Sequence, residues 1–193
     1  MKELLFGTNN QDKIREVRLI IGDQIQVRSL ADLGIELDPD ETEDTLTGNA
    51  LLKARAFHQA SGLPCFADDS GLMVEALGGA PGVYSARYAG PQATYQDNVE
   101  KMLGAMAGQE NRRAYFATVI ALVDGENEWT FEGRIDGEII DTPRGEGGFG
   151  YDPIFIPENE SQTFAEMSPE RKKAISHRAR ATQKFVDFLK SQA

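Results

Sequence analysis

Leu63-Pro64-Cys65-Phe66-Ala67-Asp68-Asp69-Ser70-Gly71-Leu72-Met73-Val74 is the stretch of this 193-residue chain that indicates its fold. An apolar run leads to two adjacent aspartates and a glycine and then resumes, which predicts a buried strand that ends at a turn. Strand ends of this kind present catalytic groups to a crevice in α/β proteins. Two neighbouring buried carboxylates need a cation or hydrogen-bond donors to stay charged. The alternative is an aspartate-rich turn, in which one side chain bonds its own backbone.

The rest of the chain alternates strand-like and helix-like segments, which predicts an α/β protein. Strands are expected over residues 3–7, 25–29, 114–123, 128–140 and 154–156. Helices are expected over residues 12–21 and 50–57, after a cap formed by Thr94 and Asp97, and after Ser168. Gly62 is expected to end the second of these helices. Residues 35–44 carry six acidic side chains and are expected to form a solvated loop.

Composition and charge narrow the class of protein. Apolar residues make up 40% of the chain and charged residues 26%, as in an ordinary globular protein, and we expect one domain over residues 1–193. A net charge of −11 argues against a nucleic-acid partner but permits a small anionic substrate held by a few basic groups or a metal. No apolar run reaches the roughly 18 residues of a membrane span. With a single cysteine, Cys65, the chain is expected to be cytoplasmic and not membrane-bound.

Gly7-Thr8-Asn9-Asn10-Gln11-Asp12-Lys13 is a candidate phosphate-binding turn. It joins a predicted strand to the N-terminus of a predicted helix, where backbone N–H groups and the helix dipole favour an anion. The turn has neither the P-loop spacing nor the glycines of a dinucleotide fingerprint. The alternative is an asparagine helix cap followed by a surface lysine.

A glycine-rich loop, residues 145–153, is a candidate site for a planar base. Its glycines allow a ligand close to the backbone, and Phe149 and Tyr151 offer ring faces for stacking. Asp152 offers an acceptor for a ring N–H group. The alternative is a glycine-rich turn with two core aromatic residues.

The basic segment Lys172-Lys173-Ala174-Ile175-Ser176-His177-Arg178 is a further candidate. Its lysines, histidine and arginine are suitable donors to a phosphate or to the carbonyl group of a base. The alternative is a basic, solvated helix face on an acidic protein.

In combination and in order, these segments resemble the inosine triphosphate pyrophosphatase family, which acts on noncanonical purine nucleoside triphosphates. The matching segments are residues 67–71, 78–88, 147–153 and 175–178. The resemblance implies an elongated mixed β-sheet with flanking helices in two lobes, and a central substrate cleft. It also implies a homodimer and a divalent metal, normally Mg²⁺.

The resemblance also implies roles for individual residues. Asp69 would activate water and contact the metal. The implied substrate contacts are Thr8, Asn9, Asn10, Gln11, Asp12, Lys13, Ser70, Phe149, Gly150, Tyr151, Asp152, Lys172, His177 and Arg178. Gly48 lies where the family often has a glutamate, so Asp40 and Glu41 are the candidates for a second metal ligand. The roles of Asp68, Arg87 and Tyr88 are left open.

The implied reaction is hydrolysis of ITP, dITP or XTP to the nucleoside monophosphate and pyrophosphate, which cleanses the nucleotide pool. In this reading Asp69 draws a proton from water that attacks the α-phosphorus, and Lys13 and Lys172 stabilise the leaving pyrophosphate. Donors from His177 and Arg178 would favour a 6-oxo purine over a 6-amino purine. Two alternatives remain: a phosphatase with an aspartate nucleophile, and a nucleotide-binding regulator without turnover.

Overall fold

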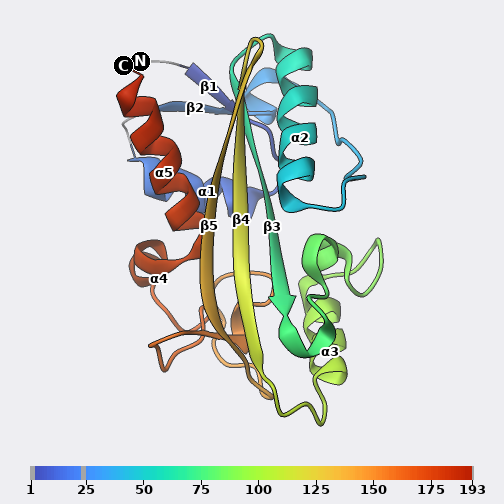
Figure 1. Cartoon of the computed structure of the whole chain (residues 1–193). Coiled ribbons are helices and arrows are strands. Elements are labelled where there is room, and N and C mark those ends of the chain that lie inside the picture. The colour runs from blue at the N-terminus through green and yellow to red at the C-terminus, as the bar shows by residue number, and fades with distance from the viewer. Residues whose placement is uncertain (1–2, 23–24, 193) are drawn as a thin grey trace. The chain divides into compact units, whose positions relative to one another are not determined.

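The chain forms a mixed α/β fold built on one six-stranded sheet (Figure 1). The structure is a computed structural model that describes residues 3–22 and 25–192; the other positions of the predicted domain, 1, 2, 23, 24 and 193, lie outside the described residues. The strands are β1 (Glu3–Phe6), β2 (Gln26–Ser29), β3 (Cys65–Val74), β4 (Arg113–Asp124), β5 (Asn127–Ile139) and β6 (Phe155–Pro157). The α-helices are α1 (Gln11–Ile21), α2 (Leu46–Ser61), α3 (Tyr95–Ala105), α4 (Pro169–Ile175) and α5 (His177–Ser191). Short 3-10 helices are η2 (Ala31–Leu33), η3 (Glu75–Leu77), η4 (Gly82–Arg87) and η5 (Asp152–Ile154).

The strand order in the sheet is β2-β1-β3-β4-β5-β6. Strand β1 runs parallel to both neighbours, with Phe6 opposite Ser29 of β2 and Phe66 of β3. Strand β6 runs antiparallel to β5, with Ile139 opposite Phe155. The predicted mixed sheet with flanking helices is therefore confirmed.

The chain divides into two compact units, each with its own apolar core. The first unit consists of Met1–Asp69, Thr118–Gly133 and His177–Ala193, and the second of Ser70–Ala117 and Arg134–Ser176. Strands β3, β4 and β5 contribute residues to both units.

The first unit buries both faces of its central strand β1. Leu4 and Phe6 point into a core shared with α1 and α5, whereas Leu5 points to the other face, where Phe57 of α2 is buried. Successive side chains of a strand point to opposite faces, so this alternation needs helices on both sides. The rings of Phe6 and Phe66 stack at 4.5 Å, which joins β1 to β3 in the core.

The core of the second unit lies between α3 and the sheet residues of that unit. Phe116, Phe155 and Phe164 form an aromatic group whose centroids are 4.8 to 6.2 Å apart. The predicted cap of α3 is confirmed: Thr94 accepts a hydrogen bond from the Asp97 backbone N–H, and the Asp97 carboxylate accepts one from the Thr94 N–H. Such a capping box satisfies two N–H groups that the helix leaves without internal partners.

One sequence expectation about strands is wrong, and another strand is present but shifted by one residue. Strand β3 does not end at Asp68 and Asp69 but continues to Val74, because lysine side chains, described below, compensate the two carboxylates within the strand. The strand expected over residues 154–156 begins one residue later, after the 3-10 helix η5. Pro153 lies in the first turn of η5, where its fixed φ angle and missing N–H favour a helical start.

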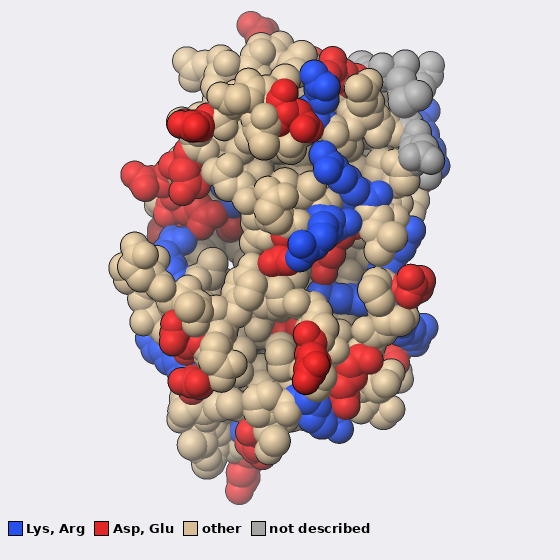
Figure 2. Space-filling view, turned by 180° about the vertical axis from the view of Figure 1, so that it is seen from behind, with Lys and Arg blue, Asp and Glu red and all other residues tan. Residues whose placement is uncertain are grey.

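Acidic and basic side chains are interspersed over the face shown in Figure 2, as expected for an acidic chain with many partnered cations. Among the helices that the structure describes, none combines the length and apolar character needed to cross a membrane.

Cys65 is expected to be chemically inert in the folded protein. It is fully buried, and burial raises the pKa of its thiol to about 12, so the reactive thiolate is scarce at pH 8. Iodoacetamide at pH 8 should leave the native chain unlabelled for hours, as measured by mass spectrometry. The same protein in urea should be alkylated at the rate of a free thiol; equally rapid labelling without urea would contradict the buried position.

Candidate active site

Asn10 caps helix α1 at the predicted phosphate turn. Its Oδ1 accepts hydrogen bonds from the backbone N–H groups of Asp12 (2.9 Å) and Lys13 (3.2 Å), and Thr8 Oγ1 accepts one from the Asn10 N–H. The asparagine cap that the sequence offered as an alternative is thus present. A surface lysine is not, because the side chain of Lys13 is only 15% exposed.

Two largely covered lysines, 15% and 11% exposed, each pair with one aspartate of β3. Lys13 Nζ lies 3.1 Å from Asp68 Oδ1, and Lys53 Nζ of α2 lies 3.0 Å from Asp69 Oδ1. Lys53 Nζ also lies 2.6 Å from Glu41 Oε1, so the ammonium group bridges two carboxylates. These pairs explain how adjacent aspartates remain inside the sheet, since buried charges require close partners.

The surroundings of the two aspartates shift their pKa values in opposite directions. Burial opposes charge on Asp68, but Lys13, Arg178 and Lys53 outweigh it and hold the pKa of its carboxyl well below the usual value. Burial raises the pKa of Asp69, and its lysine neighbours offset this only in part. Neighbouring carboxyl groups whose pKa values are driven apart are typical of acid–base sites. Asp69 is therefore the stronger candidate for a proton acceptor, and Asp68 for a permanently charged support.

Lys53 belongs to the cluster although its sequence position was not singled out above. It follows Asn49 by four positions and precedes Phe57 by four, so it lies on the buried face of α2. A lysine on the apolar face of a helix was the available signal, because such a position requires a carboxylate partner. Burial alone would lower its pKa, yet Asp69 and Glu41 outweigh burial and raise it, so Lys53 is charged.

Arg178, at the second position of α5, is 2% exposed and lies in the same cluster. Its Nε and Nη2 atoms are both 3.4 Å from Asp68 Oδ2, and its Nη1 donates to the Glu16 carboxylate of α1. Glu16 was not singled out from the sequence. The guanidinium contacts place Arg178 as a support of Asp68; a contact with a base remains a prediction.

The residues near Asp69 fit a magnesium ion that is shared with a substrate. Asp69 Oδ2 is buried and, among the described residues, has no hydrogen-bond partner. Glu41 is half-buried and contacts Lys53, which also contacts Asp69, whereas Asp40 is exposed. Glu41 is therefore the better candidate for a second ligand. Within residues 3–22 and 25–192 no group of three or more acidic, histidine or cysteine side chains is placed to hold a metal. Mg²⁺ commonly uses one or two carboxylates together with substrate phosphates and water, which suits this donor set.

In the second unit, Asp152 holds the glycine-rich loop and the basic helix together. Its Oδ2 accepts hydrogen bonds from Lys172 Nζ (2.6 Å) and from the backbone N–H of Phe149 (2.8 Å). The Lys172 ammonium group lies 5.0 Å from the centroid of the Phe149 ring, a cation–π distance. Tyr151 is buried in the core and its hydroxyl donates to the Ser85 carbonyl, which favours the alternative of a core aromatic residue.

The other predicted site residues are distributed over both units. Asn9 donates to the Leu37 carbonyl (3.1 Å), which ties the phosphate turn to the acidic loop, and Gln11 is exposed at the start of α1. His177 is buried at the start of α5 in the first unit. Ser70 and Gly150 belong to the second unit, Ser70 half-buried on β3 and Gly150 at a positive φ of 62°. The structure thus joins Lys13 with Asp68, Asp69 and Arg178 in one set, and Phe149 with Asp152 and Lys172 in another.

Replacing Gly148 with alanine should destabilise the second unit. Gly148 has a φ of +69°, and a Cβ there would overlap Asp152 Oδ2 and lie 2.8 Å from its Cγ. We expect the free energy of unfolding, measured in urea, to fall by about 1–3 kcal/mol, the cost of a strained backbone position. Disturbance of the Lys172–Asp152 pair should add to this loss. Gly150→Ala is the matched control, because its φ is +62° but its Cβ would meet nothing within 4 Å. Equal losses in the two variants would contradict a specific contact with Asp152.

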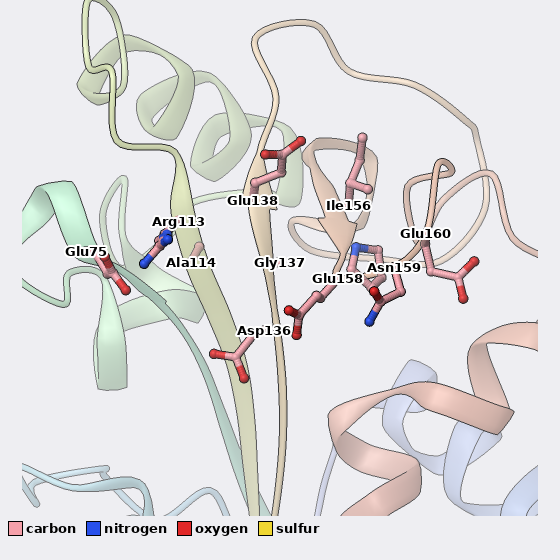
Figure 3. A pocket seen from close by; sticks show the side chains of 11 residues that line it. Glu75, Arg113, Ala114, Asp136, Gly137, Glu138, Ile156, Glu158, Asn159 and Glu160 are labelled. Carbon is pink, nitrogen blue, oxygen red and sulfur yellow. The ribbon is translucent and has the colours of Figure 1, made fainter.

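Two surface cavities lie apart from these sets. One, of about 510 Å³ in the second unit, is lined by five carboxylates and Arg113, and no predicted site residue lines it (Figure 3). A triphosphate would be repelled there by the surplus of negative charge. The other, of about 540 Å³ in the first unit, is formed by Asn9 and the segments around η2 and Leu37. It lies beside the phosphate turn.

The fold and the charged set in the first unit together define an α/β protein with a candidate phosphate-binding centre. A family model described as the Ham1 family matches residues 4–188. A dITP/XTP pyrophosphatase of Porphyromonas gingivalis is 52% identical over 190 residues, covering 98% of each chain. One of Flavobacterium johnsoniae is 48% identical over 187 residues, covering 97% of each chain. The solved structure of the Staphylococcus aureus Ham1 protein is similar with a TM-score of 0.90 and 40% identity over the full length of both chains.

The chain belongs to the Ham1 family. The family predicted from the sequence resemblance is thereby confirmed.

Proposed function

We propose that this protein hydrolyses noncanonical purine nucleoside triphosphates, ITP, dITP and XTP, to the nucleoside monophosphate and pyrophosphate. The observation that carries the proposal is the asymmetric aspartate pair: Asp69 has a raised pKa and a buried oxygen without a hydrogen-bond partner among the described residues, while Asp68 is held charged. Relatives about half identical over nearly the whole chain bear the name dITP/XTP pyrophosphatase. Both support a hydrolase that acts on a phosphoric anhydride.

In the proposed mechanism Asp69 Oδ2 takes a proton from the water that attacks the α-phosphorus. A raised pKa makes a carboxylate a better base, provided that it remains ionised at the working pH. Lys53 keeps Asp69 in place through Oδ1 and leaves Oδ2 for the water. Lys13 and Lys53 lie within contact distance of these carboxylates, and their ammonium groups would favour the negative charge of a triphosphate.

Asp69 and Glu41 would hold the divalent cation, for which Mg²⁺ is the proposed identity. When bound, the ion would neutralise phosphate charge and polarise the phosphoryl group. We propose Glu41 in preference to Asp40, on the basis of its contact with Lys53.

The second unit is proposed to bind the purine base. The half-buried Phe149 ring offers a stacking face, which is worth about 1–3 kcal/mol for a nucleic-acid base. Lys172 would donate to the 6-oxo group of hypoxanthine or xanthine, whereas a 6-amino group is itself a donor and cannot accept this hydrogen bond. His177 and Arg178 remain proposed substrate contacts.

A product assay tests the reaction and the substrate class together. The purified chain is incubated with Mg²⁺ and ITP, XTP, dITP, ATP or GTP, and phosphate is measured with and without added inorganic pyrophosphatase. We expect phosphate only with the added enzyme and mainly from the first three nucleotides. Direct release of orthophosphate, or a trapped phosphoenzyme, would instead indicate a phosphatase with an aspartate nucleophile. Tight binding without turnover would indicate a nucleotide-binding regulator.

We also propose a homodimer and a cytoplasmic location. The lone buried cysteine supports a reducing compartment, and the dimer follows from the family resemblance. Sedimentation equilibrium of the purified chain, whose protomer mass is 21.2 kDa, tests the dimer; a single species of protomer mass would contradict it.

A further inference from the structure

Asn49, in the first turn of α2, makes two hydrogen bonds to the backbone of a single residue in the acidic loop. Its Oδ1 accepts from the Glu43 N–H (3.0 Å), and its Nδ2 donates to the Glu43 carbonyl (3.2 Å). The Asn49 side chain is fully buried. A buried amide satisfied in this way is costly to remove, because the partner groups would be left without hydrogen bonds.

Gly48 gives the loop the room to follow this path. A Cβ at position 48 would lie 2.7 Å from Glu43 Cβ and 2.9 Å from Glu43 Cγ, closer than real Cβ atoms approach. The Gly48 N–H donates to Thr45 Oγ1, the cap of the helix. Glycine is unfavourable inside a helix, so its presence in α2 is explained by the close approach of the loop.

Helix α2 contacts the acidic loop at a second point, through the side chain of Lys53. Lys53 lies one turn after Asn49, and its Nζ contacts Glu41, two residues before Glu43 in the loop. The same Nζ contacts Asp69. Asn49 therefore holds the loop backbone next to the point where the loop delivers a carboxylate to the Asp69 cluster.

We propose that Asn49 is a positioning residue: its two hydrogen bonds to Glu43, with the space left by Gly48, hold Glu41 beside Asp69 and so set the affinity of the divalent cation site. This inference rests on the proposed function, in which Glu41 and Asp69 are the metal ligands. Residues that orient metal ligands typically change metal affinity or activity by about 10–100-fold when they are replaced.

The first test compares Asn49→Ala with Glu41→Gln in the full chain. Mn²⁺ binding is measured directly by electron paramagnetic resonance without nucleotide, and the Mg²⁺ concentration for half-maximal ITP hydrolysis is measured separately. We expect each variant to weaken Mn²⁺ binding by about 10-fold or more. In a Glu41→Gln background, we also expect Asn49→Ala to weaken Mn²⁺ binding by less than a further twofold. Both changes act on the ligand at position 41, so their effects should not add.

Asn98→Ala is the matched control for the loss of a buried amide. Asn98 is also buried in a helix, α3, and also makes two backbone hydrogen bonds, to the Ala89 N–H and the Ala86 carbonyl. It should lower the melting temperature about as much as Asn49→Ala and leave Mn²⁺ binding unchanged.

Gly48→Ala keeps the test open if Asn49→Ala fails to fold. Alanine favours the helix, yet its Cβ should displace the loop and weaken Mn²⁺ binding. Adding Glu43→Gly removes the clashing atoms and should restore most of the affinity.

Three results would overturn the proposal. Normal Mn²⁺ binding in both Asn49→Ala and Gly48→Ala, with weak binding in Glu41→Gln, would refute the positioning role and leave the proposed metal site intact. Full additivity with Glu41→Gln would mean that Asn49 acts only on general stability. Normal metal binding in Glu41→Gln would refute Glu41 as a ligand, and with it the positioning role of Asn49.

Discussion

Asp69→Asn is expected to lower kcat for ITP hydrolysis by about 10²- to 10⁴-fold, the range for loss of a general base. Asparagine keeps the shape of the side chain and an oxygen for Lys53, whose Nζ lies 3.0 Å from Asp69 Oδ1. It cannot take a proton at the buried Oδ2 position. The loss should therefore appear mainly in kcat, with the melting temperature little changed.

Steady-state kinetics at saturating Mg²⁺, together with thermal unfolding, would check this expectation. Asp136→Asn serves as a control, since Asp136 is an exposed carboxylate in the second unit that pairs with the exposed Arg134. Activity of Asp69→Asn within threefold of the parent would remove Asp69 from the proposed mechanism.

Asp68→Asn is expected to destabilise the first unit by about 3–5 kcal/mol, the usual cost of breaking a buried ion pair from one side. The change leaves Lys13 and Arg178 without the carboxylate that both contact. Arg178 is 2% exposed, so water cannot solvate its guanidinium group in place of the lost carboxylate. Urea unfolding at pH 7 would measure the effect.

The exposed pair between Arg55 and Glu128 is the matched control. Its two hydrogen bonds of 2.7 Å are shorter than the 3.4 Å contacts between Arg178 and Asp68, but the Arg55 side chain is 56% exposed. Glu128→Gln should cost no more than about 1 kcal/mol. If the two variants lost equal stability, the buried position of the Asp68 cluster would not matter energetically.

The parent and Asp68→Asn should also differ in how their stability falls in acid, as measured by urea unfolding between pH 7 and pH 2. The pKa of Asp68 is lower in the folded protein than its usual value of 3.8, so its charge stabilises the fold at every pH above that value. This contribution is lost as the pH falls below 3.8 towards the lowered native pKa. The parent should lose stability over this range, and Asp68→Asn should show a shallower decline.

Local signals in the sequence predicted local structure well. Ser168, Thr94 and Gly62 mark helix boundaries through hydrogen bonds or a backbone angle that involve near neighbours, so their role is visible in a short window. The acidic loop was likewise predicted from its own residues. The strand ending at Asp68 was mispredicted, because the cations that allow a continuous strand come from α1, α2 and α5.

The candidate site was predictable only in part for the same reason. Lys13 and Asp69 were found through motifs, and Lys53 could have been found as a lysine on an apolar helix face. Glu16 carries no such signal, since its partner Arg178 is 162 positions away in the sequence. Contacts of that separation depend on the topology of the sheet and not on local composition.

The division of the first unit into three separate segments has a consequence for synthesis of the chain. Its charged cluster joins Glu16 and Asp68 to Arg178, which lies in the last helix of the chain. A nascent chain therefore carries its two aspartates and their lysines long before the arginine that completes their burial leaves the ribosome. Loop closure over such distances is entropically costly and slows folding. We expect the first unit to reach its native state only after Arg178 has left the ribosome, so its folding yield should depend on how well chaperones protect β1 and β3 until then.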